Sequence, residues 1–75
     1  MIAQQNTTFT LRQGEEYIQL IQLLKAVGCV ETGAEAQESV TRGFVKRNGQ
    51  TELRKRAKLV PGDTIEFKHY IITIA

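Results

Sequence analysis

The residues of this chain that could do chemistry are cations gathered in one short stretch. Residues 42 to 58 hold seven of the ten Lys and Arg residues and a single acid, Glu52, so this stretch carries a formal charge of +6. Residues 1 to 41 carry −3 and residues 59 to 75 carry −1, which leaves a net charge of only +2. A basic face of this kind needs a compensating anion, and the phosphates of a nucleic acid supply one.

Arginine and lysine in this stretch would bind phosphate in different ways. The arginine guanidinium offers a planar fork to two oxygens, whereas the lysine ammonium is a point charge. We therefore expect Arg54 and Arg56 to contribute more than the lysines beside them. An extended backbone would place residues 54, 56 and 58 on one face. Neutralising about four to seven phosphates predicts a slope of roughly −3 to −6 for log K against log salt. The alternative is a surface strand whose charges are solvated.

Other reactive side chains are too few for catalysis or metal binding. The chain has one cysteine, Cys29, and one histidine, His69, while a structural zinc site needs about four ligands. We expect a partly buried Cys29, an exposed His69 at a turn, and no reaction at either. Because no glycine-rich phosphate loop or nucleophile elbow occurs, the sequence favours a protein without enzymatic activity, metal or cofactor.

Length and hydropathy favour one small cytoplasmic domain. The first residues lack a charged start followed by an apolar run, and no segment approaches the ~20 apolar residues of a membrane span. A single core in a chain of 75 residues leaves a net stability of about 3–5 kcal/mol. We expect polar residues 1–7 to form a flexible segment and residues 8–75 to form the domain.

Aromatic side chains could add base stacking to the phosphate contacts. The candidates are Tyr17, Phe44 and Tyr70, but the chain has only five aromatic residues and no tryptophan. We expect the core to use these three, so the sequence favours phosphate and shape recognition over base-by-base reading.

The segments that must position the cations begin with a strand and a helix. Residues 8 to 11 alternate between polar and apolar, which predicts a short strand. Residues 15 to 27 carry apolar side chains three and four apart, which predicts a helix. Glu15 and Glu16 would lie in its first turn, and Gly28 would end it in a left-handed conformation.

The second half of the chain predicts another helix and then strands. Thr32 and Glu35 fit a capping box at the start of a helix that ends at Gly43. The period then drops to two, and Asn48-Gly49 and Pro61-Gly62 mark tight turns between strands. This order predicts an α+β fold with a short N-terminal strand, two packed helices and a small, mostly antiparallel sheet of hairpin-linked strands.

Five short motifs follow one another along the chain: Val27-Gly28, residues 31–36, Gly43-Phe44-Val45, Asn48-Gly49 and Val60-Pro61-Gly62-Asp63. In this order they resemble the RNA-binding domain named after small-subunit ribosomal protein four, the S-four domain. The resemblance covers about residues 14 to 67. Together with the basic run from Arg54 to Lys58, it is closer still to the small stand-alone bacterial proteins of the YbcJ type.

This resemblance implies an S-four-like fold with an alpha-L motif, and RNA binding on a face built from the helix pair and the hairpin. Many family members carry basic residues on the second helix where this chain has Gly33 and Gln37. Binding would therefore rest on other cations. The expected RNA-binding residues are Lys25, Arg42, Lys46, Arg47, Arg54, Lys55, Arg56 and Lys58.

Two classes of function remain open from the sequence. The first is a non-catalytic protein that binds structured RNA, with ribosomal RNA as the expected ligand and association with the ribosome as a further expectation. The second is a small protein-interaction adaptor that uses the strand from Tyr70 to Ile74 as an exposed edge for strand addition. We do not expect DNA binding, because helix two offers only Arg42, at its end, for reading bases.

Overall fold

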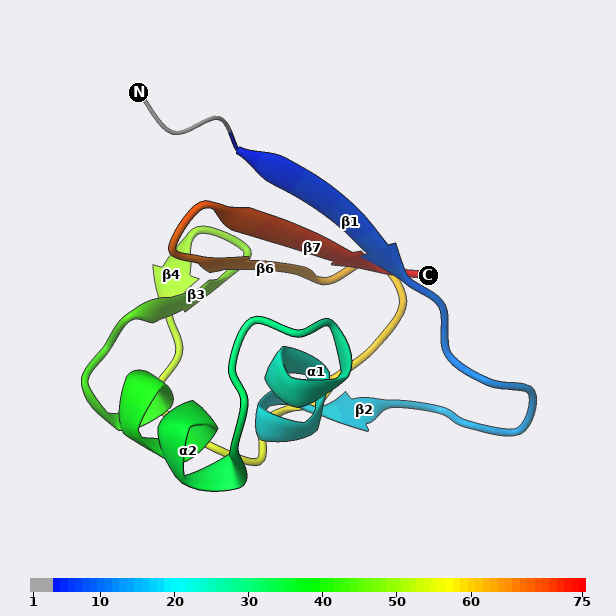
Figure 1. Cartoon of the computed structure of the whole chain (residues 1–75). Coiled ribbons are helices and arrows are strands. Elements are labelled where there is room, and N and C mark those ends of the chain that lie inside the picture. The colour runs from blue at the N-terminus through cyan, green and yellow to red at the C-terminus, as the bar shows by residue number, and fades with distance from the viewer. Residues whose placement is uncertain (1–3) are drawn as a thin grey trace.

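The computed structural model describes residues 4–75, in which two helices lie on one side of a five-stranded sheet (Figure 1). In chain order the elements are β1 (Gln5–Phe9), β2 (Ile18–Gln19), α1 (Leu20–Ala26), α2 (Gly33–Thr41), β3 (Val45–Arg47), β4 (Gln50–Thr51), β5 (Lys58–Leu59), β6 (Thr64–Phe67) and β7 (Tyr70–Ile74). The predicted α+β class is confirmed. No helix in this part of the chain is long and apolar enough to span a bilayer.

The main sheet joins the two ends of the described chain. Its strand order is β1-β7-β6-β3-β4, and all neighbours are antiparallel except β1 and β7, which run parallel. The first strand begins at Gln5, earlier than the predicted strand over residues 8 to 11, because the whole of β1 pairs with β7. Residues 5 to 7 of the predicted flexible segment therefore lie in β1, whereas residues 1 to 3 fall outside the described residues. The predicted domain boundary at residue 8 stays a prediction.

β7 is an internal strand, although the sequence suggested an exposed edge. It lies between β1 and β6, so its backbone has a hydrogen-bonded neighbour on each side (Figure 1). Strand addition at Tyr70–Ile74 would have to displace β1. The edge-strand premise of the adaptor hypothesis is therefore wrong. The prediction failed because β1 pairs with β7, and the polar sequence of β1 gave little indication that it would form a strand there.

The core lies between the helices and the sheet. Its fully buried members come from both helices and from β3, β5, β6 and β7, and each such side chain stabilises the fold by about 1.5–3 kcal/mol. The largest are Phe67, Leu20, Leu23, Leu24, Leu59, Ile65, Ile72, Ile74, Val40 and Val45. The helix pair and the sheet therefore share one hydrophobic core.

The first helix is shorter than predicted. It begins at Leu20 rather than Glu15, because Ile18 and Gln19 pair with β5 in a second, two-stranded antiparallel sheet. The amide of Leu20 donates to the carbonyl of Ala57 at 3.0 Å. Backbone groups of the basic stretch thus cap the helix, where the sequence predicted an acidic first turn.

The second helix begins and ends as the sequence predicts. The amide of Glu35 donates to the Thr32 hydroxyl at 3.1 Å, and the Glu35 carboxylate accepts from the amide of Glu31 at 2.8 Å. At the other end Gly43 has a φ of +80°, and the amide of Phe44 donates to the carbonyl of Ser39 at 3.1 Å. This left-handed ending turns the chain directly into β3.

The predicted turns are confirmed, but the basic run is not extended. Asn48 and Gly49 have φ angles of 51° and 86°, as their hairpin turn requires. Residues 54 to 57 instead form a turn in which the amide of Ala57 donates to the carbonyl of Arg54 at 3.2 Å. The cause is Ala57, which is buried in the core and bends the run inward.

Candidate nucleic-acid interface

Four of the eight predicted cations line one open hollow on the surface. The hollow has a volume of about 430 Å³, and Ala57 forms part of its wall. We call it the basic hollow; its residues are Arg47, Arg54, Arg56, Ala57 and Lys58. The sequence predicted that residues 54, 56 and 58 would share one face. They do meet, but around a turn and not along a strand.

Backbone hydrogen bonds fix the turn that carries these side chains. The carbonyl of Lys55 accepts from the amide of Ile21 at 3.1 Å, next to the bond between Ala57 and Leu20. The first amides of a helix have no partner within the helix. The basic turn satisfies two of them, so its position depends on α1.

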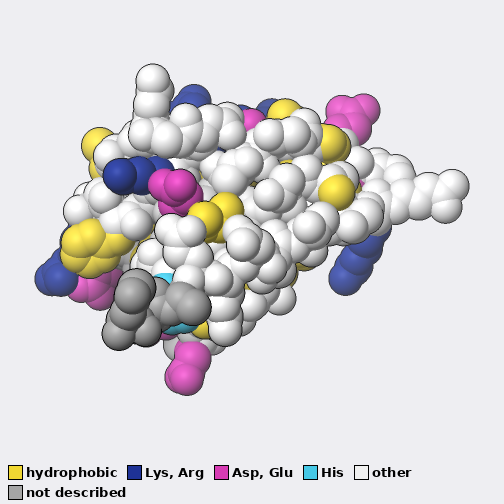
Figure 2. Space-filling view, turned by 90° about the horizontal axis from the view of Figure 1, so that it is seen from above, with side chains coloured by type: hydrophobic (Ala, Val, Ile, Leu, Met, Phe, Trp, Pro, Cys, Tyr) yellow, Lys and Arg dark blue, Asp and Glu magenta, His cyan; other side chains and the backbone are white. Residues whose placement is uncertain are grey.

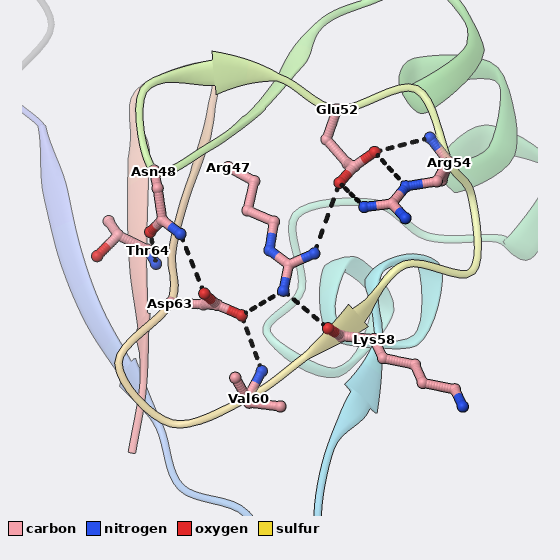
Figure 3. Close-up of polar contacts among 8 residues, drawn as sticks. All are labelled: Arg47, Asn48, Glu52, Arg54, Lys58, Val60, Asp63 and Thr64. Atoms are coloured by element: carbon pink, nitrogen blue, oxygen red, sulfur yellow. Dashed lines mark hydrogen bonds and ion pairs between the residues drawn. The ribbon is translucent and has the colours of Figure 1, made fainter.

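Arg47 is the best-held cation of the hollow (Figure 3). Its Nη2 atom donates to Asp63 Oδ2 at 2.8 Å and to the carbonyl of Lys58 at 2.9 Å, while Nη1 lies 3.6 Å from Glu52 Oε1. Its side chain is only 22% exposed. Arg47 therefore ties the β3 hairpin to β5 and to the turn before β6.

The Asp63 carboxylate accepts hydrogen bonds from three donors in this network. Besides Arg47, its carboxylate accepts from the Asn48 side-chain amide at 3.0 Å and from the amide of Val60 at 2.9 Å. The Asn48 carbonyl oxygen in turn accepts from the amide of Thr64 at 2.9 Å. Burial acts to raise the pKa of Asp63, but the bonds from Val60, Asn48 and Arg47 outweigh it and lower the pKa. Asp63 is thus held as a carboxylate.

Glu52 holds the second arginine of the hollow. It accepts from Nε and Nη2 of Arg54, both at 3.1 Å, and from the Arg54 amide at 3.1 Å. The side-chain bond from Arg54 lowers the pKa of Glu52 against the effect of burial, and it raises the pKa of Arg54. Glu52 therefore neutralises part of the charge that Arg54 and Arg47 bring.

The remaining cations of the hollow are not paired with acids. Within residues 4–75, neither Arg56 nor Lys58 makes a salt bridge, and both side chains are exposed. The Lys58 ammonium lies over the Tyr17 ring, 5.0 Å from its centroid. Two unneutralised cations beside two held arginines give a positive concave surface, which concentrates anions.

The other four predicted residues do not line the hollow. Lys25 lies in the last turn of α1, at the end away from the basic turn. Arg42 caps α2 and lies 3.3 Å from Glu38, in a pair more than 60% exposed that adds little stability. Lys46 and Lys55 are exposed neighbours of hollow residues.

The face over β1 differs from the basic hollow in its charge. Figure 2 shows that face, on which uncharged surface dominates and Lys and Arg side chains stand apart from one another near the margins. Acidic side chains lie among them. This largely uncharged face therefore differs from the basic hollow, where four cations gather.

The prediction that three aromatic residues lie in the core is wrong for two of them. Phe44 is 56% exposed and Tyr17 is 39% exposed. Tyr70 is half-buried against the core and stacks with His69, the ring centroids 4.4 Å apart. His69 is thus partly covered, where the sequence predicted an exposed side chain. Cys29 is buried as predicted, and burial raises the pKa of its thiol.

The sequence left three functional residues of the site unassigned. Asp63 and Asn48 were identified only as turn residues, and Glu52 only as an opposing charge. The signal for Glu52 was its isolation among seven cations. Asp63 had no such signal, because its partner Arg47 lies sixteen residues away. Within residues 4–75, no group of three or more His, Cys, Asp or Glu residues could hold a metal ion.

Comparisons with known proteins find a matching family model and two similar proteins. The model of the S4 domain family matches residues 9–75. The "Putative RNA-binding protein YbcJ" of Escherichia coli (strain K12) is 37% identical over 67 residues, which cover 89% of this chain and 94% of that protein. The "Uncharacterized protein YbcJ" of Shigella flexneri matches to the same extent.

A solved structure matches as well. The solution structure of YbcJ from E. coli superposes with a TM-score of 0.69 at 37% identity, over 91% of this chain and 85% of that one. That structure is described as revealing an alfaL motif involved in RNA-binding.

Proposed function

The chain belongs to the S4 domain family, and from that premise we propose that it is a non-catalytic RNA-binding protein. It engages structured RNA through the basic hollow, by contacts to phosphates and by shape. Its relative YbcJ is named for RNA binding, and the family is the one that the sequence motifs resemble. Ribosomal RNA is the proposed ligand, and the cytoplasm and the ribosome are where the protein would meet it.

The observation that carries this proposal is the imbalance of charge around the hollow. Four cations face one concavity, and only Arg47 and Arg54 are paired with acids. Arg56 and Lys58 remain to neutralise phosphates, together with the exposed Lys55 between Arg54 and Arg56. Each phosphate neutralised releases counterions, so affinity for RNA would depend steeply on salt.

The decisive variant removes the two hollow cations that make no salt bridge and keeps Arg47 and Arg54, which are paired with acids. Arg56→Ala with Lys58→Ala is expected to reduce the magnitude of the slope of log K against log salt by about 2. RNA affinity at physiological salt would fall by about 10- to 100-fold. Binding of the purified protein to a labelled ribosomal RNA hairpin, titrated at four or more salt concentrations, measures both quantities.

A matched control removes the same charge elsewhere. Arg12 and Lys68 are exposed, and neither lines the hollow. Lys68 has a φ of +55°, a conformation that asparagine tolerates. Arg12→Ala with Lys68→Asn should keep the affinity and the slope close to the wild type. Equal losses in both double variants would show that net charge alone, and not the hollow, determines binding.

A further inference from the structure

An exposed apolar pair lies on the hairpin next to the basic hollow. Phe44 is 56% exposed and Leu53 is 60% exposed, the two largest values among the exposed large hydrophobic side chains of residues 4–75. Leu53 Cδ2 is 3.9 Å from the position that a Cβ on Gly43 would occupy. Leu53 therefore packs beside the backbone that leads into Phe44.

Strand register explains why both side chains point away from the core. Lys46 pairs with Thr51, and the amide of Glu52 donates to the carbonyl of Val45 at 2.9 Å. The same register, continued by one residue, sets Phe44 opposite Leu53. Side chains alternate along strands. Because Val45 and Glu52 are buried on the inner face, Phe44 and Leu53 belong to the outer face with Lys46 and Thr51.

The surroundings of this pair are cationic. Lys46 shares its face and is exposed, Arg42 precedes Phe44 by two residues, and Arg54 follows Leu53 directly. Arg54 also lines the basic hollow, so the apolar pair on the outer face of the hairpin and the hollow are one residue apart along the chain. We call Phe44 and Leu53 the apolar platform. Such a platform with cations near it complements an anionic ligand that also has a flat apolar surface.

Phe44 is the aromatic ring best placed for such a ligand. The Tyr17 ring has the Lys58 ammonium over it, and Tyr70 is stacked with His69. Among residues 4–75, no ring stacks on Phe44 and no cation lies over it. Its backbone amide also donates to the carbonyl of Ser39, which ties residue 44 to the end of α2.

We propose that Phe44, supported by Leu53, stacks on one unpaired base of the RNA whose phosphates occupy the basic hollow. The preferred ligand is therefore a helix with an unpaired nucleotide beside it, such as a hairpin loop or a bulge, in preference to a continuous duplex. Stacking on an aromatic ring tolerates any base, so the selection is for structure. This inference rests on the proposed RNA-binding function.

The first test uses a tryptophan at the platform. The chain has no tryptophan, so Phe44→Trp creates a single indole whose emission reports on position 44 alone. Titration with a hairpin RNA is expected to quench this emission at the stoichiometry of binding. A blunt RNA duplex with the same stem sequence should bind with little quenching. Gln13→Trp, at an exposed residue outside both the platform and the hollow, should show little quenching with either RNA.

The second test measures affinity. Phe44→Ala is expected to weaken binding of the hairpin by about 10- to 100-fold and binding of the duplex by less than about 2-fold. Phe44→Leu keeps an apolar side chain without an aromatic face and should lose most of the same affinity. Gln13→Ala is the control, at an exposed residue outside both the platform and the hollow, and it should leave both affinities unchanged.

The possible results separate this inference from the proposed function. Steep salt dependence with equal hairpin affinity for Phe44→Ala and wild type would overturn base stacking and leave the RNA-binding function intact. Failure of the wild type to bind either RNA would overturn both. Self-association abolished by Phe44→Ala, without a change in hairpin affinity, would assign the platform to a second copy of the chain and overturn the inference.

Discussion

The basic hollow has two sides that carry the same kind of side chain under different constraints. On one side Arg47 is 22% exposed and bonded to Asp63, to the carbonyl of Lys58 and, more distantly, to Glu52. On the other side Arg56 is exposed and makes no salt bridge within residues 4–75. The first side connects three segments of the fold. The second side is free to meet an anion.

This difference separates stability from binding among residues that look alike in the sequence. A cation paired with buried carboxylates has much of its charge neutralised already, and its loss would leave those acids without a partner. An exposed, unpaired cation can be removed with little effect on the fold. Substitutions on the two sides should therefore produce opposite patterns of effect.

The largest effect on stability should come from Asp63. Asp63→Ala leaves the amide of Val60, the side chain of Asn48 and Arg47 without their common acceptor. We expect a loss of about 2–4 kcal/mol in the free energy of unfolding, which is most of the stability of so small a domain. Urea denaturation followed by circular dichroism measures it. Glu38→Ala, at an exposed surface pair, should change stability by less than about 0.5 kcal/mol.

The two arginines can be compared directly by the same conservative change. Arg47→Lys replaces a fork that reaches several acceptors by a single ammonium, and we expect a loss of about 1–2 kcal/mol in stability. Arg56→Lys should cost less than about 0.5 kcal/mol but weaken RNA binding by a few fold. If both variants unfold at the same urea concentration, Arg47 does not have the structural role described here.

Low pH should destabilise the fold through Asp63 and Glu52, the carboxylates that bond Arg47 and Arg54. The pKa values of Asp63 and Glu52 are lower in the folded chain than their ordinary values of 3.8 and 4.5. Each carboxylate therefore stabilises the fold fully above its ordinary pKa, and this contribution disappears as the pH falls through the lowered one. We expect unfolding free energy to decline from about pH 5 downward. Asp63→Asn should be less stable at neutral pH and show a shallower decline.

The smallest effect should come from releasing Arg54, a cation that is paired with an acid, from the negative charge of Glu52. Glu52→Gln keeps a carbonyl oxygen as acceptor for Arg54 but removes the negative charge beside the hollow. We expect RNA affinity at low salt to rise about 2- to 5-fold, with a steeper salt slope. Unchanged affinity would mean that Arg54 reaches the RNA equally well while paired.

Local signals in the sequence predicted much of this fold. The left-handed glycines, the capping box of α2 and the Asn48-Gly49 hairpin each depend on a few neighbouring residues, and all are confirmed. The start of α1 was wrong because pairing with β5, some forty residues later, overrides an amphipathic pattern. β1 was placed too late for the same reason, since its partner is β7.

The candidate site was predictable in composition but not in arrangement. Counting charges is enough to find seven of the eight predicted cations, yet four of them meet only because Ala57 bends the basic run toward the core. Which cations remain unpaired depends on Asp63, which reaches Arg47 from the turn before β6, and on Glu52, which bonds Arg54 two residues away. The exposure of Phe44 also followed from register, since residues 44 and 46 share a face only once β3 is known to begin at Val45.

The parallel pairing of β1 with β7 has a kinetic consequence. The two strands lie at opposite ends of the described sequence, so the entropy of closing almost the whole chain must be overcome before they meet. The helices and hairpins depend on nearer contacts and can form sooner. Until β1 docks, β7 exposes an edge with the sequence YIITI, which is uncharged, β-branched and free of proline, the composition that favours intermolecular sheets. We therefore expect the polar β1 to cover this aggregation-prone edge only late in folding.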